Sequence, residues 1–305
     1  MSEKSNLAPV AVFAFNRPDH LGATLRALAA NELAAETTLH VFLDGPRNDS
    51  DREAQKKILE LLSSDIQKNF KAVKLTHSEK NKGLANSIIF GVTKIVNEYG
   101  RIIVLEDDLV TSKYFLRYMN DGLNVYENEE KVISIHAYVN ILQDENIHEP
   151  FFLKGSDCWG WATWKRGWAL FEPNGQKLLK EIQDRKLESE FNFENSYNYF
   201  GMLKAQVAGK VNSWAVRWYA AAFLNNKLTL YPAISFVKNI GLDGSGAHCD
   251  VVSDYEVDLA QIPVTNFPVH IEASKEGYVA YCRMHNSIRP SLFGKIILRM
   301  KRVFR

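Results

Sequence analysis

Short apolar runs recur along the first 110 residues of the chain, separated by longer amphipathic stretches. Residues 9–15 form a continuous apolar run, which is typical of a strand buried on both faces. Similar runs occupy residues 39–43 and 101–105, and a shorter one lies at residues 72–76. The pattern therefore predicts a strand at each of these places.

The segments between these runs have the spacing of amphipathic helices. One helix is expected to begin at Asp19, a residue type that caps helix N-termini, and two more are expected at residues 51–62 and 83–98. Alternation of strands and helices at this spacing predicts parallel βαβ units. We therefore expect an α/β fold with a Rossmann-like, mostly parallel open sheet flanked by helices.

The second half of the chain is less regular. Its tryptophans are crowded near residue 160, a charged helix is predicted at residues 177–190, and a strand is predicted at residues 231–236. A glycine-rich loop follows at residues 241–246. No repeat or linker separates the halves, so a soft boundary is placed near residue 145.

Composition and charge narrow the function. The chain has 305 residues and a formal net charge of +1, from 37 basic and 36 acidic residues. This balance argues against a protein that coats nucleic acid. Three cysteines are too few for a disulfide framework and predict a reducing, cytosolic compartment. No signal peptide and no apolar run long enough to span a bilayer is visible.

Polar clusters follow three of the predicted strands. Asn16 and Arg17 follow the first, Asp44 follows the second, and Glu106-Asp107-Asp108 follows the strand at residues 101–105. Ligands of open α/β sheets bind beyond the carboxyl ends of the strands, so these clusters are expected to share one edge.

The acidic triplet is the strongest candidate for chemistry. Three adjacent carboxylates repel one another, and a divalent cation such as Mg²⁺ or Mn²⁺ relieves that repulsion through hard oxygen ligands. The alternative is a solvated loop that caps the next helix. The apolar strand before Glu106 favours the metal site.

Several stretches carry a resemblance to a known family. Residues 158–164, 213–218 and 237–249 look like motifs of a bacterial cell-surface polysaccharide transferase subgroup, and two further stretches lie in the first half. Val-Leu-Glu-Asp-Asp-Leu at residues 104–109, followed by Tyr114 and Phe115, resembles the acidic motif of GT-A-fold glycosyltransferases. It looks most like the N-acetylglucosaminyltransferase I group and bacterial family 2-type enzymes that build surface polysaccharides. Ala-Phe-Asn-Arg-Pro at residues 14–18 is similar to the first-strand turn of those enzymes.

The resemblance implies roles for individual residues. Asp108 would bind the metal together with Glu106, Asp107 would contact the ribose or the metal, and Asp44 would read the uracil base. Further contacts to the nucleotide sugar are expected from Asn16, Arg17, Lys82 and Arg217. His248, in the loop after the glycines, would be a further metal ligand; the alternative is a loop histidine without a ligand.

An inverting transferase also needs a carboxylate that takes the proton of the acceptor hydroxyl. The N-acetylglucosaminyltransferase I group has an aspartate just ahead of a tryptophan in its second half, but residues 211–214 contain no acid here. Asp157, immediately before the tryptophan cluster, is the first substitute, and Asp243 is the second.

Trp159 and Trp161 are predicted to offer indole faces on which an acceptor sugar stacks. The alternative is that they fill the core, as large aromatic side chains most often do.

Residues 287–305 combine apolar and basic side chains at helical spacing, and no acidic residue follows Glu276. Such a basic amphipathic helix is suited to an anionic membrane surface. The alternative is a helix docked on the protein itself or on a partner subunit. We expect a cytoplasmic protein held peripherally at the inner face of the cytoplasmic membrane.

The expected organisation is a nucleotide-sugar-binding half at residues 1–145, an acceptor-binding half at residues 146–286, and the C-terminal helix. The expected activity is metal-dependent transfer of a hexosyl or N-acetylhexosaminyl group, with inversion, from a UDP-sugar to a lipid-linked surface glycan. Two rivals remain. A sugar nucleotidyltransferase would usually have a glycine-rich first loop, which residues 15–18 lack. A non-catalytic sugar- or lipid-binding module would have kept the fold without the base.

Overall fold

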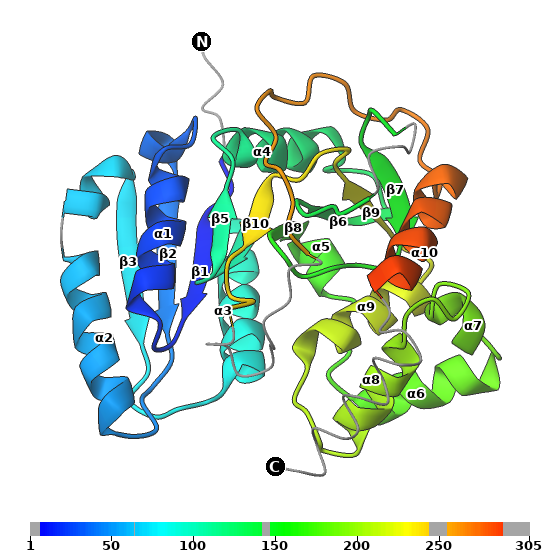
Figure 1. The fold of residues 1–305 in the computed structure, drawn as a ribbon, viewed down its shortest axis with the longest axis horizontal. Coiled ribbons are helices and arrows are strands. Elements are labelled where there is room, and N and C mark those ends of the chain that lie inside the picture. Colours follow the sequence, from blue (N-terminus) through cyan, green and yellow to red (C-terminus); the bar gives the residue numbers. More distant parts are fainter. Residues whose placement is uncertain (1–6, 64, 142–146, 244–254, 289–305) are drawn as a thin grey trace.

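The structure is a computed structural model that describes residues 7–63, 65–141, 147–243 and 255–288 (Figure 1). Within these residues, none of the helices has the length and apolar character needed to cross a membrane.

One eight-stranded sheet, in the order β3-β2-β1-β4-β8-β6-β9-β7, runs through the molecule. Its strands are β1 (Val10–Ala14), β2 (Thr38–Leu43), β3 (Ala72–His77), β4 (Arg101–Glu106), β6 (Val132–His136), β7 (Phe151–Lys154), β8 (Trp161–Trp164) and β9 (Leu228–Tyr231). The strands β3, β2, β1 and β4 are mutually parallel, β8 is antiparallel to β4 and β6, and β9 is parallel to β6 but antiparallel to β7. The predicted α/β class, with a mostly parallel open sheet, is confirmed.

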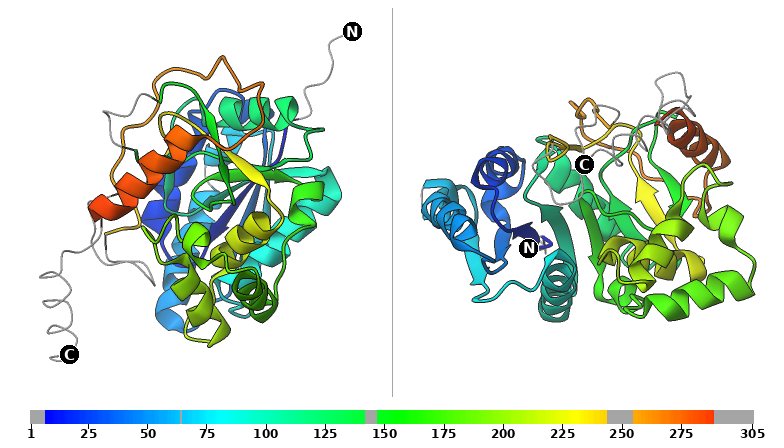
Figure 2. Two further views of the ribbon diagram at one scale, coloured as in Figure 1. Left: turned by 90° about the vertical axis from the view of Figure 1, so that its right-hand side faces the viewer. Right: turned by 60° about the horizontal axis from the view of Figure 1, so that its bottom comes forward.

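Helices cover both faces of this sheet (Figures 1 and 2). They are α1 (Pro18–Ala29), α2 (Asp49–Leu62), α3 (Leu84–Tyr99), α4 (Phe115–Val125), α5 (Lys165–Trp168), α6 (Gly175–Asp184), α7 (Glu188–Phe191), α8 (Tyr199–Val207), α9 (Trp214–Leu224) and α10 (Lys275–Ile288). Val10 and Val12 pack in the core under α1 and α2, whereas Ala11 and Phe13 pack in the core under α3. Burial on both faces explains why β1 has no polar alternation.

The four strands and three helices predicted for the first 110 residues are all present, with small shifts at their ends. One such shift concerns the first helix. It begins at Pro18, with Arg17 as its N-cap, so the expectation that Asp19 opens it is wrong. Proline is favoured at this position because its missing N–H would have no helical partner there.

Two predictions in the second half are wrong. A strand is expected at residues 231–236, but the observed strand β9 runs from Leu228 to Tyr231 and so ends where the expected one would begin. The next residue, Pro232, has no N–H to donate to a ladder. The helix expected at residues 177–190 ends at Asp184, and the backbone turns left-handed at Lys186 (φ 54°). A short separate helix, α7, follows.

A two-stranded antiparallel sheet joins β5 (Leu109–Thr111) to β10 (Val237–Asn239). It places the segment after residue 236 against the residues that follow the acidic triplet. Strands from both sides of residue 145 share the large sheet, and the division of the chain at that point stays a prediction. Within the segment 287–305, residues 289–305 lie outside the described residues.

Candidate active site

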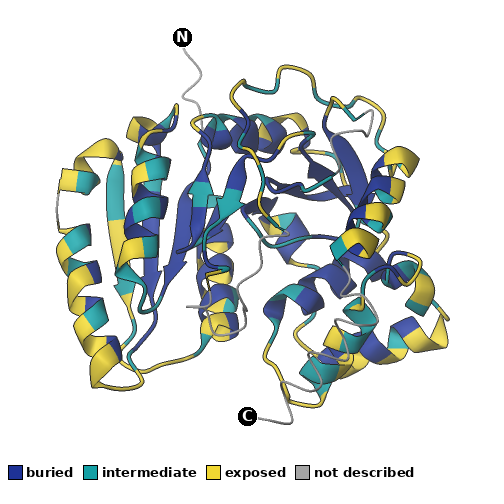
Figure 3. Cartoon of the chain, viewed as in Figure 1, coloured by how far each residue is buried: buried dark blue, intermediate teal, exposed yellow. Residues whose placement is uncertain are grey.

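The site begins at the carboxyl end of β4, beside the carboxyl ends of β1 and β2. Phe13 of β1 is in register with Glu106, so the acidic triplet lies next to the turn that follows β1. Asp107 and Asp108 are buried, and Glu106 is half-buried. Figure 3 shows that the strands leading to this edge are buried, which leaves little water to solvate three carboxylates.

Arg17 neutralises part of this charge. Its guanidinium donates to Oδ2 of Asp108 at 2.8 Å and, from the same nitrogen, to Oδ1 of Asp107. Burial lowers the pKa of Arg17, but the charges of Asp107 and Asp108 outweigh it, so the pKa lies above the usual value. As the N-cap of α1, Arg17 is placed by the turn after β1, so this pairing links two of the predicted clusters.

The carboxyl groups of Glu106 and Asp107 hold protons more tightly than usual. Burial, followed by the charges of Asp108 and Asp107, raises the pKa of Glu106 to about 8. Burial also raises the pKa of Asp107 to about 6, although the charge of Arg17 opposes the shift. A further cation bound beside Glu106 and Asp107 would favour the deprotonated, negatively charged form of both side chains.

The oxygen-only donor set, which already holds one cationic group, fits Mg²⁺ or Mn²⁺. Such ions are commonly held by one or two carboxylates, with phosphate oxygens as further ligands. Within the described residues, no group of three His, Cys, Asp or Glu side chains is placed to hold a metal. The residues present therefore suit an ion that shares its ligands with a bound phosphate.

The raised pKa of Glu106 predicts a pH-dependent metal affinity. Below a pH of about 8 the carboxyl group carries a proton that a divalent cation must displace, so affinity should rise with pH. For one displaced proton the rise is about tenfold per pH unit between pH 6 and 8. Calorimetric titration with Mn²⁺ in buffers of different ionisation enthalpy would count the released proton. Glu106→Gln should flatten the dependence, and an unchanged slope in that variant would contradict the assignment.

Gly241, in the segment after β10, lies directly against the Asp108 carboxylate. The backbone N–H of Ile240 donates to the carbonyl of Asp108 at 2.9 Å, and Asn239 pairs with Leu109. A Cβ added at Gly241 would overlap the Asp108 carboxylate and lie 2.8 Å from Nη1 of Arg17. A side chain is therefore excluded at this position while Arg17 and Asp108 are paired.

Gly241→Ala is accordingly expected to weaken Mn²⁺ and donor binding about tenfold, because the added Cβ would push the Asp108 carboxylate out of the position in which it holds the ion, and overpacking of this kind costs about 1–3 kcal/mol. Gly209→Ala is the control, since its added Cβ meets nothing within 4 Å, although the left-handed backbone there makes some loss of stability normal. Calorimetric titration of both variants with Mn²⁺ and with donor would show whether the loss of affinity is specific to Gly241. Equal losses in the two would show that Gly241 has no special role at the site.

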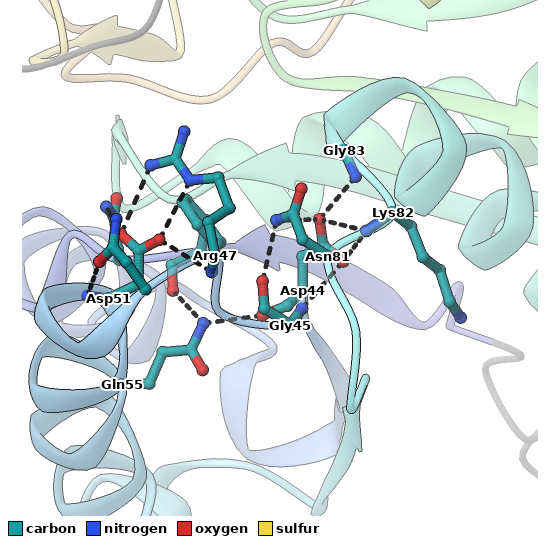
Figure 4. A network of polar contacts seen from close by, with 11 residues as sticks. Asp44, Gly45, Arg47, Asp51, Gln55, Asn81, Lys82 and Gly83 are labelled. Carbon is teal, nitrogen blue, oxygen red and sulfur yellow. Dashed lines mark hydrogen bonds and ion pairs between the residues drawn. The ribbon is translucent and has the colours of Figure 1, made fainter.

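Asp44 has a different role from the one expected. Its carboxylate accepts hydrogen bonds from the backbone N–H groups of Gly45, Lys82 and Gly83 and from the Asn81 side chain, at 2.8–3.2 Å (Figure 4). A carboxylate has about four acceptor positions, and these donors fill them. The prediction that Asp44 reads a base through its carboxylate is therefore wrong, and Asp44 instead fixes the loop between β3 and α3.

A second network lies beside it (Figure 4). The buried carboxylate of Asp51 accepts from Asn16 at 2.7 Å and from Arg47 at 3.0 Å. The Arg47 hydrogen bond is the largest of the causes that lower the pKa of Asp51 to about 2. The Arg47 guanidinium lies 4.5 Å above the Phe15 ring. Asn16 is thus held near the site by Asp51, and the pairing of Asp51 with Arg47 was not predicted from the sequence.

Two of the predicted phosphate contacts lie elsewhere. Lys82 is exposed, its side chain points away from the network in Figure 4, and its Nζ lies 4.8 Å above the Phe90 ring. Arg217 is buried at the start of α9 and donates to the carbonyls of Ser213 and Pro173 and to Asn212. These bonds engage each of its three nitrogens within the protein, and the contact of Arg217 with the nucleotide sugar stays a prediction.

Asp157 joins the site from the second half, in the segment between β7 and β8. Its side chain is 32% exposed, and Oδ1 accepts from the backbone N–H of Cys158 at 2.8 Å. Burial raises the pKa of Cys158, with further contributions from the charges of Asp157, Glu106 and Asp108. The Cys158 thiol is therefore close enough to both the predicted base and the acidic triplet to sense their charges.

The second candidate base, Asp243, is 49% exposed, and its Oδ2 lies 3.1 Å from Nε2 of His20 on α1. This contact ties the segment after β10 to the first helix. His248 lies outside the described residues, so its predicted metal contact stays a prediction.

The two tryptophans chosen for acceptor binding differ. Trp161 is fully buried and lies 5.5–5.8 Å from the rings of Trp168, Trp214 and Trp218, so the prediction that it forms an acceptor platform is wrong. Trp159 is half-buried between Tyr138 and Tyr255, with both rings edge-on to the indole. Only Trp159 of the pair keeps an accessible surface near Asp157.

Three residues at this edge escaped the sequence analysis. His136 ends β6, His20 pairs with Asp243, and Gly241 covers Asp108. For His136 a signal existed, because the mostly apolar stretch at residues 132–135 is followed by a polar residue, as the other strands are.

Comparisons with known proteins give limited likenesses. No protein-family model matches the chain, and no curated protein matches it. A crystal structure of residues 1–349 of S. aureus TarS in complex with UDP aligns with a TM-score of 0.34 and 13% identity, over 48% of this chain and 40% of that one. The mannosyltransferase PcManGT from Pyrobaculum calidifontis, in complex with GDP-Man and Mn²⁺, aligns with a TM-score of 0.31 and 10% identity, over 46% and 40%. The chain thus spans less than half the length of each.

Proposed function

We propose that the protein is a metal-dependent glycosyltransferase that uses a nucleoside-diphosphate sugar, with UDP as the expected nucleotide. The observation that carries this proposal is the pair of buried carboxylates, Asp107 and Asp108, that hold a cationic group at the carboxyl end of β4. A diphosphate with a bound divalent cation suits these residues, because the carboxylates can pair with the cation and Arg17 can pair with the phosphate. Asp157 is hydrogen-bonded to the backbone of Cys158, whose thiol senses the charges of Glu106 and Asp108, and it would serve a second reactant there.

The roles of the residues follow from charge. Asp108 and Glu106 would hold Mn²⁺ or Mg²⁺ together with phosphate oxygens of the donor, and a bound divalent cation neutralises charge on the departing diphosphate. Arg17 would exchange its carboxylate partners for a phosphate oxygen, which keeps its own charge paired. The motif residues of the first half therefore bind and orient the donor.

Asp157 would take the proton of the acceptor hydroxyl as the acceptor oxygen bonds to the anomeric carbon and the bond from that carbon to the β-phosphate oxygen breaks. Attack from the face opposite the leaving group inverts the configuration. The exposed third of the Asp157 side chain gives an acceptor room to approach. The half-buried indole of Trp159 offers a face to a sugar ring beside it.

A donor screen tests this function. UDP-, GDP- and other nucleotide sugars would be added to the protein with Mn²⁺, and the thermal midpoint would be recorded. The largest shift is expected when cation and nucleotide sugar are present together, because each then supplies part of the other's binding site. A protein that gains stability from no nucleotide sugar at saturating concentration would contradict the proposal.

We further propose a lipid-linked surface glycan as the acceptor and contact of residues 287–305 with an anionic membrane. The basic residues there would contribute roughly 1 kcal/mol each near such a surface, over a Debye length of about 8 Å at physiological salt. Truncation before Ser287 should release the protein from anionic vesicles in a sedimentation assay, and high salt should do so in part. Activity on a soluble acceptor should survive, and its loss would assign the segment to the core.

A further inference from the structure

A buried histidine lies directly behind the predicted base. His136 is the last residue of β6, its side chain is fully buried, and Nε2 lies 3.6 Å from Oδ2 of Asp157. Neither ring nitrogen has a hydrogen-bond partner among the residues that the structure describes. Asp157 is the polar group that the ring faces.

The surroundings fix the orientation of this ring. The Tyr231 ring lies 5.0 Å from it and the Tyr138 ring 6.4 Å, both edge-on. On the strand, His136 is in register with Trp161 of β8. Rings packed in this way leave the imidazole little freedom to turn away from Asp157.

The two oxygens of Asp157 are in different situations. Oδ1 is held by the backbone N–H of Cys158, whereas Oδ2 faces His136. A movement of about 0.5 Å would bring Nε2 and Oδ2 within hydrogen-bond distance. Burial lowers the pKa of His136, although the charge of Asp157 opposes this, so the neutral ring is favoured and can donate one N–H.

We propose that His136 is a positioning residue that donates its Nε2–H to Asp157 and holds that carboxylate toward the acceptor. The inference rests on the proposed function, because it assigns His136 a part in the same proton transfer. Held at Oδ1 by Cys158 and at Oδ2 by His136, the carboxylate keeps a fixed direction while it accepts the proton.

If His136 only fills space in the core and makes no contact with Asp157, its replacement has different consequences. An imidazole buried without partners is less favourable than a phenyl ring of similar size, because its polar atoms are desolvated without return. His136→Phe should therefore leave the thermal midpoint unchanged or raise it. A positioning role predicts that the same change lowers turnover.

The kinetic test compares His136→Phe with His136→Gln, whose side-chain amide can place an N–H where Nε2 lies. His136→Phe should lower kcat about tenfold or more with the donor KM nearly unchanged, and His136→Gln should restore most of the loss. A kcat unchanged in His136→Phe, or an equal loss in both variants, would overturn the proposal. If His136→Phe fails to fold, a His136→Gln variant with wild-type kcat still supports it, and one with a tenfold loss overturns it.

A second measurement needs no turnover. In ¹⁵N-histidine-labelled full-length protein, NMR should show His136 protonated at Nε2, and Asp157→Asn should shift that resonance. A ring protonated at Nδ1, or a resonance indifferent to Asp157→Asn, would overturn the contact. If the wild-type chain turns over no donor, the proposed function fails and the positioning role fails with it, whereas the NMR result still decides whether His136 touches Asp157.

Discussion

Replacing Asp108 with asparagine is expected to lower sugar transfer about 10³-fold or more. The substitution removes one of the two buried carboxylates at the end of β4, and neutralisation of a leaving diphosphate by a bound cation is worth several kcal/mol. Donor affinity in Mn²⁺ should fall as well. The fold should survive, because Asp107 still pairs with Arg17. Initial rates and calorimetric donor affinities would be measured side by side.

Asp184→Asn is the matched control, since it makes the same chemical change on the exposed surface of α6. It should leave both rate and affinity at wild-type values. Treatment with EDTA should reproduce the Asp108→Asn defect, and added Mn²⁺ should reverse it in the wild type only. Full activity in EDTA would contradict the metal role of the triplet.

Replacing Asp157 with asparagine is expected to lower kcat about 10²-fold or more, which is the usual scale for loss of a general base. Donor affinity should be nearly unchanged, because the donor is held by the residues after β1 and β4. Initial rates and calorimetric donor affinities would check both expectations.

Asp243→Asn supplies the comparison. Asp243 is paired with His20 and half-exposed, so this variant should keep most of its kcat. If Asp243→Asn collapses while Asp157→Asn is unaffected, the base belongs to the segment after β10. If neither variant loses activity, both candidates are wrong.

The first half of the fold was predictable because its physical causes are local. A strand buried on both faces needs an apolar run. Residues 9–15 and 101–105 therefore predict β1 and β4 without reference to the rest of the chain. Polar residues that directly follow such strands must lie at the sheet edge. The position of Glu106, Asp107 and Asp108 therefore followed from the pattern.

The roles that failed depend on partners distant in sequence. Whether Asp44 is free depends on residues 81–83, which reach back to fill its acceptor positions. Whether Trp161 is exposed depends on the pairing of β8 with both β4 and β6, which places the indole against α9. No local pattern encodes either contact.

We propose above all that the acidic end of β4 binds a nucleotide sugar with a divalent cation and breaks the bond between its sugar and the β-phosphate. Release of nucleoside diphosphate tests it most directly, because many transferases slowly hydrolyse their donor without an acceptor. Wild-type protein in Mn²⁺ should release the diphosphate, Asp108→Asn should release none above background, and Asp184→Asn should match the wild type. A wild-type chain that binds nucleotide sugars but releases no diphosphate, with or without acceptor glycans, would contradict the claim and identify a binding module.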